Sequence, residues 1–581
     1  MAELRVWAPK VRKVELDCNG QMVAMDGNDN GWWTLNAPFI VHGTDYAFRL
    51  DGQAPSLPDP RSAWQAHGVH GPSRWVDHTR FAWNDSGWQP TPLGAALIYE
   101  LHVGTFTPQG TFEAVIERLD YLAQLGVTHI ELMPVAEFSG TRGWGYDGVA
   151  LYAPHQPYGG PEGLKCLVDA CHRRGLAVLL DVVYNHLGPA GNYLDRFGPY
   201  FTSRYATPWG EAVNLDGPHS DQVRRFFIDN ALMWMRDYHI DGLRIDAIHA
   251  FADTSAIHFL EQLAEQTRCL QAHRGRHYVL IAESDLNDPR VIRPTEIGGY
   301  GLDAQLNEDF HHALHAALTG ERDGYYRDFG RLGDLARVLT AGLAYDGRYS
   351  VFRRRNHGRP ATGISAHRFV GYLQNHDQIG NRALGERSSR LLSSGLLKIG
   401  AALVLTAPFV PMLFQGEEWG AASPFFYFTD HQDPELGEAV RQGRRKEFAD
   451  FGWDPEQIPD PQDHDTFLRS KLDWTETQRT PHSDILLWHQ TLIGLRRCIS
   501  SLTDGRFSET RVSFDETAKW LTMIRGPLTV VCNLADAVQR IACSNLGAKE
   551  VVLHSEAPIS VDGGTIELPG QSVAVLADKE A

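Results

Sequence analysis

The sequence has few cysteines, no excess of positive charge and no apolar run long enough to cross a membrane. Its seven cysteines are an odd number and include no CxxC pair, so we interpret them as reduced thiols of a cytoplasmic protein. No apolar stretch reaches the roughly 20 residues of a transmembrane helix. The first residues lack a basic segment followed by an apolar run, so we expect no secretory leader.

The charge balance argues against polyanionic partners. The chain has 54 basic and 72 acidic residues, a formal net charge of -18, which would repel nucleic acid or an anionic membrane. We therefore expect neither as a partner, and a neutral substrate instead. We interpret the basic run at residues 353–355 as a solvated face or as an internal partner for carboxylates.

The pattern of hydrophobic residues changes twice along the 581 residues, which are too many for one core. Residues 1–90 alternate apolar and polar positions between Gly, Asn and Asp turns, which predicts a β-sandwich. Residues 91–500 alternate strand and helix patterns eight times, and residues 501–581 return to β alternation. The predicted fold class is α/β, a (β/α)8 TIM barrel with an N-terminal and a C-terminal β-sandwich.

Eight apolar runs are the predicted barrel strands, and helical spacing follows them. We expect helices at residues 112–122, 163–174, 221–238, 255–270, 310–318, 391–406 and 485–499. The strands are predicted at residues 97–101, 129–133, 177–183, 242–246, 279–283, 304–306, 371–377 and 410–414.

Three carboxylates follow predicted strands four, five and seven. These are Asp246, Glu283 and Asp377. Because the C-terminal strand ends of such a barrel meet on one face, we expect the three side chains to converge. A single Asp at a strand end is more often a helix cap or a surface group, but three on separate strands favour an active site.

The residue types suggest how the carboxylates divide the work of cleaving a glycosidic bond, which needs one ionised and one protonated carboxyl group. Arg244 is expected beside Asp246 and favours its ionised form, as suits a nucleophile. The apolar residues before Glu283 suit a proton donor. Asp377 would hold sugar hydroxyls and favour the distorted ring.

The strand carrying Asp246 is the predicted centre of the site. Leu243 and Ile245 are expected to point inward, with His249 and the charged residues crowding the end of the strand. His186 could equally be a satisfied core histidine. Asn185 and His186 have no third ligand at a suitable spacing, so we predict no metal and no cofactor.

Four segments resemble the signature regions of the α-amylase superfamily. They are DVVYNH at 181–186, GLRID at 242–246, IAES at 281–284 and QNHD at 374–377. The resemblance implies a retaining mechanism with Asp246 as nucleophile, Glu283 as acid and base, and Asp377 as stabiliser of the transition state. It also implies that the sugar at the cleavage point is bound by Arg244, His186, His376, Tyr146 and Asp147. Core packing is the alternative for Trp144 and Tyr146.

Further segments are similar to the maltooligosyltrehalose trehalohydrolases. They are HGVHGPS at 67–73, GLDAQ at 301–305, FFYFTDH at 425–431, GRRKEF at 443–448 and SKLDW at 470–474. RVWAP at 5–9 resembles the start of a module that this family shares with glycogen branching enzymes and isoamylases. Leu306, beside the cleft, departs from the aromatic residue we expect there. Trehalose recognition would fall to side chains near the end of strand eight, unless residues 425–428 only pack the loop. These candidates are Glu417, Trp419, Tyr427, Asp430 and His431.

The resemblance implies hydrolysis of the α-1,4 bond next to the terminal trehalose of a maltooligosyl trehalose, with related α-glucans as partners. A glycogen branching enzyme, which passes the glycosyl group to a sugar hydroxyl, is the alternative within the superfamily. A noncatalytic carbohydrate-binding scaffold is the alternative from another class, and the presence of all three carboxylates argues against it.

Overall fold

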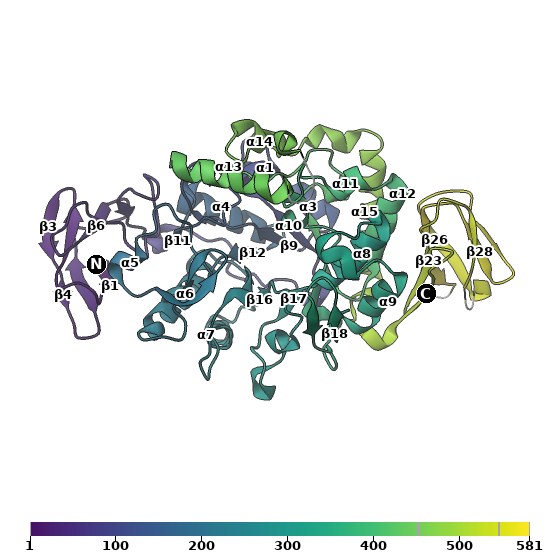
Figure 1. Ribbon diagram of the computed structural model, residues 1–581, viewed down its shortest axis with the longest axis horizontal. Helices are drawn as coiled ribbons and strands as arrows, with labels where there is room; N and C mark the ends of the chain where they lie inside the picture. The colour runs from purple at the N-terminus through teal and green to yellow at the C-terminus, as the bar shows by residue number, and fades with distance from the viewer. Residues whose placement is uncertain (1, 450–453, 544–545, 580–581) are drawn as a thin grey trace.

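A closed barrel of eight parallel strands forms the centre of the protein. The computed structural model describes residues 2–449, 454–543 and 546–579. The barrel lies in the middle of an elongated molecule, and a β-rich region forms each end of the molecule's long axis (Figure 1). The predicted fold class is confirmed.

The barrel has eight strands in the predicted order, although several are shorter than their apolar runs. The seventh, expected at residues 371–377, is displaced: it ends at Gly371, and Asp377 lies in a short helix beyond it. Each strand pairs in parallel with the next, and the eighth closes on the first. They are β8 (Ile98–Leu101), β9 (His129–Leu132), β12 (Ala177–Val182), β15 (Gly242–Ile245), β16 (Val279–Ala282), β17 (Ala304–Leu306), β20 (Phe369–Gly371) and β21 (Val410–Phe414).

Helices surround the barrel, and some of their limits differ from the prediction. The first predicted helix is split near Glu117 into two short ones, and the helix expected at 255–270 begins at Phe259, where the side chain of His258 caps it. The main helices are α2 (Phe112–Ile116), α3 (Leu119–Leu125), α4 (Gly160–His172), α6 (Ser220–Asp237), α7 (Phe259–Arg274), α8 (Glu308–Thr319), α9 (Leu332–Ala341), α12 (Ser394–Thr406), α13 (Pro434–Ala449) and α15 (His482–Cys498). No helix in the described ranges is both long and apolar enough to span a bilayer.

Alternation along the strands sorts apolar and charged side chains into layers. Alternate residues of a strand face opposite sides, so Leu179 shares the barrel interior with Asp181, as does Ile281 with Glu283. Leu179 and Ile281 belong to an apolar cluster inside the barrel. The charged residues on these inward faces, Asp181 and Glu283, come later in the sequence than the apolar ones. They therefore lie toward the C-terminal end of the barrel.

The expectation that Leu243 and Ile245 point into the barrel is wrong. They belong to the large cluster that packs the strands against the helices, whereas Arg244 between them pairs with Asp181 of the neighbouring strand. The period of two explains this, because inward placement of Arg244 turns both of its neighbours outward.

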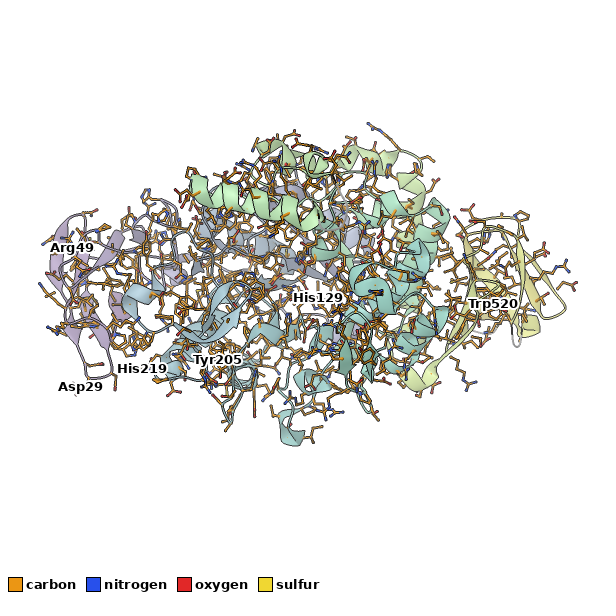
Figure 2. The ribbon with its side chains drawn as sticks, viewed as in Figure 1. Asp29, Arg49, His129, Tyr205, His219 and Trp520 are labelled. Atoms are coloured by element: carbon orange, nitrogen blue, oxygen red, sulfur yellow. The ribbon has the colours of Figure 1, made fainter. Side chains whose placement is uncertain are left out.

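The β-rich ends consist of short antiparallel sheets. Near the N-terminus the sheets are β1 (Ala2–Trp7), β5 (Trp32–Ala37) and β4 (Asp26–Gly27), and β3 (Gln21–Ala24), β2 (Val14–Cys18), β6 (Asp45–Leu50) and β7 (Ser73–Arg74). Near the C-terminus they are β22 (Thr510–Asp515), β23 (Trp520–Arg525), β24 (Leu528–Asn533), β29 (Ser572–Asp578) and β26 (Lys549–His554), and β25 (Gln539–Ala542), β28 (Thr565–Leu568) and β27 (Ser560–Asp562). Figure 2 places Arg49 and Trp520 toward opposite ends of the molecule and His129 near its middle. The domain limits 1–90, 91–500 and 501–581 stay a prediction.

A buried cluster of charges fastens the segment before the barrel to the N-terminal ends of its strands. His172 at the end of α4 contacts Asp85 with Nδ1 (2.8 Å) and Asp241 with Nε2 (2.9 Å). Asp85 also pairs with His239 and Arg276. Burial alone would lower the pKa of His172, but the hydrogen bonds to Asp241 and Asp85 raise it above the usual value.

We predict that His172→Gln destabilises the protein, and more at pH 6 than at pH 9. Removing one partner of a buried ion pair costs about 3–5 kcal/mol. Since folding raises the pKa of His172, its charge contributes fully below the usual histidine pKa and the contribution fades as pH rises through the folded value. Urea denaturation at both pH values measures the difference. His554→Gln, at an exposed position, is the control, and an equal effect of His172→Gln at both pH values would contradict the assignment.

Candidate active site

A cleft with a volume of about 460 Å³ lies at the C-terminal ends of the barrel strands. Four aromatic residues, four carboxylates and two histidines dominate its walls. The lining side chains are Trp144, Tyr146, Asp147, His186, Trp209, Asp246, Ala247, His249, Glu283, Asp377, Asn381 and Tyr427. The structure therefore brings together all three carboxylates predicted from separate strand ends.

One guanidinium contacts two of these carboxyl groups. Arg244 donates from Nη1 to Asp246 Oδ1 at 2.7 Å, and its Nη2 lies 3.4 Å from Glu283 Oε2. Nη1 also contacts both oxygens of Asp181, at 2.9 and 2.8 Å. Arg244 itself is buried beneath the floor of the cleft. Its position fixes Asp246 and Glu283 on the same side of the barrel mouth.

The backbone turn after β15 holds the two carboxyl groups in different environments. Asn185 Nδ2 donates to Asp246 Oδ2 at 2.8 Å, so both oxygens of Asp246 accept hydrogen bonds. Glu283 Oε2 accepts from the backbone N–H of Ala247 at 2.6 Å. Ala247 has φ 41°, a left-handed conformation that is uncommon for a residue with a side chain and often occurs at functional sites.

The surroundings of Glu283 favour its protonated form. Burial, together with the negative charges of Asp246 and Asp377, raises the pKa of Glu283 to about 8 against the opposing charge of Arg244. Asp246, by contrast, accepts hydrogen bonds from a cation and an amide. One carboxyl group can thus donate a proton while its neighbour is held by donors.

A second network supports the other wall of the cleft. Tyr146 donates its hydroxyl hydrogen to Asp181 (2.6 Å) and accepts from His376 Nε2 (2.7 Å), and its ring stacks on that of His376 at 5.3 Å. The Nδ1 of His376 donates to Glu100. Burial would lower the pKa of His376, but the charges of Asp377 and Glu100 raise it to about 9, so the imidazole is charged beside Asp377.

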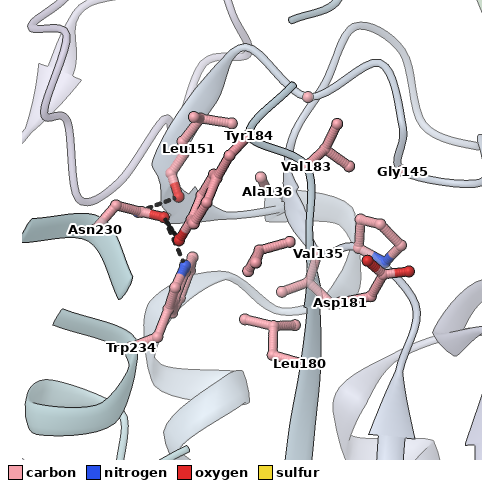
Figure 3. A pocket seen from close by; sticks show the side chains of 13 residues that line it. Val135, Ala136, Gly145, Leu151, Leu180, Asp181, Val183, Tyr184, Asn230 and Trp234 are labelled. Atoms are coloured by element: carbon pink, nitrogen blue, oxygen red, sulfur yellow. Dashed lines mark hydrogen bonds between the residues drawn. The ribbon is translucent and has the colours of Figure 1, made fainter. Parts of the chain in front are cut away.

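Helix α6 fixes the segment that carries Asn185 and His186. Asn230 accepts hydrogen bonds from the Tyr184 hydroxyl (2.6 Å) and from Trp234 Nε1 (3.1 Å), and it donates to the carbonyl of Leu151 (2.8 Å). Figure 3 shows this network at the edge of a small cavity of about 10 Å³. The side chain after Tyr184 is thereby aimed at Asp246.

Some predicted residues line the cleft at its rim, and two lie beneath it. Asp147, His186, His249 and Tyr427 are at the surface of the cleft, whereas Arg244 and His376 are buried below and reach it only through the side chains they contact. His431 Nε2 lies 4.0 Å from Asp147 Oδ2.

Four of the five residues predicted to bind the trehalose side do not line the cleft, namely Glu417, Trp419, Asp430 and His431. Gly416, with φ 82°, turns the chain after β21, so Trp419 is fully buried and donates from Nε1 to Glu476. The same turn buries Glu417, whose Oε2 accepts from the N–H of Phe414.

Asp430 pairs with Arg142 at 2.9 Å and accepts a hydrogen bond from the N–H of Thr141. It therefore links its own loop to the loop that contains Thr141 and Arg142. Leu306, expected beside the cleft, is buried in the apolar interior of the barrel.

Sequence reasoning missed Trp209 and Asn381. Trp209 is 48% exposed and projects from the turn between β13 (Phe201–Thr207) and β14 (Gly210–Val213), with its ring stacked on His186 at 4.4 Å. The available signal in the sequence was a Trp between two turn-forming residues, Pro208 and Gly210. Asn381 donates to Asp377 Oδ1 at 3.2 Å. Within the described ranges, no group of three His, Cys, Asp or Glu side chains is arranged to hold a metal ion.

Comparison with known proteins gives consistent results. The model of the α-amylase catalytic domain matches residues 66–206. A protein of Mycobacterium tuberculosis named malto-oligosyltrehalose trehalohydrolase is 50% identical, with 99% of each chain covered. A crystal structure of an α-amylase-type protein from Salmonella typhimurium superposes with a TM-score of 0.91 at 38% identity, covering 99% of this chain and 97% of that one. The 1,4-alpha-glucan branching enzyme of Bacillus caldolyticus is 33% identical over 52% of this chain and 50% of its own.

We predict that Glu283 titrates with a pKa near 8 and that Asp377→Asn lowers this value. The charge of Asp377 helps to keep the proton on Glu283, so its removal makes the ionised form less costly. Infrared difference spectra between the parent and Glu283→Gln, recorded against pH, isolate the protonated carboxyl band. A band already lost at pH 6 in the parent would show that burial does not hold the proton.

Proposed function

Because the chain belongs to the malto-oligosyltrehalose trehalohydrolase family of the α-amylase superfamily, we propose that it is a retaining glycoside hydrolase. It cleaves the α-1,4-glucosidic bond next to the terminal trehalose of a maltooligosyl trehalose. The products are trehalose and a shortened maltooligosaccharide. The observation that carries this proposal is the contact of Arg244 with both Asp246 and Glu283.

Asp246 is the nucleophile in this proposal. Its two oxygens are held by Arg244 and Asn185, and a positive neighbour favours the carboxylate form that attacks the anomeric carbon. The attack breaks the bond to the trehalose unit and leaves the glucan chain joined to the enzyme through Asp246. Water then attacks the same carbon and releases the chain, which restores the original configuration.

Glu283 is the general acid and then the base. Its raised pKa supplies a proton to the leaving oxygen of trehalose at neutral pH. Once that proton is gone, the carboxylate can take one from the attacking water. The proton released in the second half of the reaction restores the starting form of Glu283.

Asp377 and the charged His376 beside it stabilise the transition state. His376 Nε2 lies 3.6 Å from Asp377 Oδ1, and the Asp377 side chain lines the cleft. A carboxylate there can accept hydrogen bonds from sugar hydroxyls and favour positive charge at the ring. Tyr146, stacked on His376, offers the sugar an aromatic surface.

The rest of the cleft suits a neutral oligosaccharide. Trp209 and Tyr427 add aromatic surface, and Asp147 and His249 add polar groups at the rim. Tyr427 is the member of the predicted trehalose-side set that reaches the cleft, so we assign it to that side. The seven cysteines are unpaired, which supports a cytoplasmic location.

We predict that the purified protein releases trehalose from maltopentaosyl trehalose and forms no α-1,6 bonds in amylose. Chromatography of the products and NMR of the treated amylose measure both outcomes. Asp246→Asn, which removes the nucleophile at nearly constant volume, is the matched control and should release no trehalose while it keeps the melting temperature within a few degrees. New α-1,6 branches without free trehalose would favour a branching enzyme. If neither trehalose nor α-1,6 branches formed, the result would favour a noncatalytic carbohydrate-binding scaffold.

A further inference from the structure

Asp377 is the only one of the three carboxylates that does not directly follow a barrel strand. Strand β20 ends at Gly371, and Asp377 lies six residues later in the one-turn helix α10 (His376–Gly380). The strand therefore cannot set the direction of this carboxyl group. Whatever holds α10 against the barrel determines where Asp377 points.

Part of α10 is held by its own turn. Asn375 caps the helix by accepting from the N–H groups of Asp377 (2.9 Å) and Gln378 (3.3 Å), while the Gln378 amide oxygen accepts from the N–H of Asn375 (3.2 Å). At the other end Gly380 lies against the ring of Trp144, where an added Cβ would be only 2.0 Å from the ring. These contacts shape the turn, and His376 binds Glu100 of β8, but none of them links α10 to the sixth strand, β17, which pairs with β20.

Glu308 provides that link. It is the first residue of α8, two positions after the end of β17. Its Oε2 accepts from the amide nitrogen of Gln378 at 3.1 Å, and its Oε1 accepts from the hydroxyl of Tyr372, which follows β20. One carboxyl group thus joins the end of the sixth strand to both the seventh strand and α10.

The carboxyl group of Glu308 lies close to other charged or titratable groups. Asp377, Arg244 and Asp285 act on it electrostatically, and His312 Nε2 lies 3.8 Å from its Oε2. Burial raises the pKa of Glu308 to about 7. A glutamate that served only to begin α8 could extend into solvent, as first-turn acidic residues of helices commonly do. Glu308 is turned inward, toward the helix that carries Asp377.

We propose that Glu308 is a positioning residue that orients Asp377 through Gln378. The proposal rests on the proposed function, because it acts through the role assigned to Asp377. Glu308 does not line the cleft and contacts no reacting atom. Its contribution is to keep α10 seated so that the Asp377 carboxylate faces the sugar.

The first test compares Glu308→Ala with Glu308→Gln in hydrolysis of maltopentaosyl trehalose. Glu308→Ala removes both hydrogen bonds, and a small displacement of a catalytic group costs up to about 100-fold, so we expect kcat to fall about 10- to 100-fold with KM changed less than about threefold. Glu308→Gln should stay within about threefold of the parent, because the amide can accept from Gln378 and donate to the Tyr372 hydroxyl. An equal loss in both variants would overturn the proposal.

The second test asks whether the effect passes through Asp377. We expect the double variant Glu308→Ala with Asp377→Asn to be no slower than Asp377→Asn alone, because a positioning residue has nothing left to position. Losses that multiply would overturn the proposal. If Asp377→Asn itself hydrolysed at the parental rate, the proposed function would fail instead.

Two further variants separate positioning from a structural effect. Glu261→Ala removes a first-turn glutamate of α7 and should leave kcat unchanged, which controls for loss of an acidic helix terminus. Gln378→Ala breaks the same link from the other side and should lower kcat as Glu308→Ala does, which keeps the test valid if Glu308→Ala does not fold. A parental kcat for folded Gln378→Ala would also overturn the proposal.

Discussion

The buried guanidinium of Arg244 is the interaction on which the cleft depends. It contacts Asp181, Asp246 and Glu283, three acids that would otherwise repel one another in an environment poor in water. A buried cation is itself costly unless such partners surround it. Strand register makes the arrangement possible, because β15 lies between β12 and β16 and places Arg244 directly opposite Asp181. The carboxylates and the arginine therefore require one another.

This constraint places neighbouring acids in different environments. Burial, with the negative charges of Asp246 and Asp377, raises the pKa of Glu283 although Arg244 lies beside it, whereas Asp246 receives the shortest contact from that guanidinium. The second cation is His376, whose positive charge is favoured by the neighbouring carboxyl groups of Glu100 and Asp377. The apolar layer deeper in the barrel keeps water away from the inner side of these charged groups. This distribution of charge suits the proposed catalysis, in which one carboxyl group donates a proton and the other attacks the sugar.

Sequence patterns predicted the parts of this site that strands impose. Period-two alternation and apolar runs located eight strands, and Asp246 and Glu283 follow strands directly, so their convergence could be predicted. The position of Asp377 depends on a short helix held by side-chain contacts, which no periodicity reveals. Trp419 was misplaced because a left-handed glycine turn reverses the chain after β21. Trp209 was missed because a hairpin within a long connection brings it to the cleft, and its partner His186 is distant in sequence.

The most direct test of the central claim is to identify which carboxylate becomes covalently bonded to sugar. Incubation with a 5-fluoro-α-glucosyl fluoride, which forms the glycosyl–enzyme faster than it is hydrolysed, followed by peptide mass spectrometry, locates the bond. The account predicts an adduct of one 5-fluoroglucosyl unit, formed with release of the anomeric fluoride, on the peptide that contains Asp246, and none when Asp246 is replaced by Asn. An adduct on the peptide that contains Glu283 or Asp377 would contradict the account, because it would mean that Arg244 does not select the nucleophile.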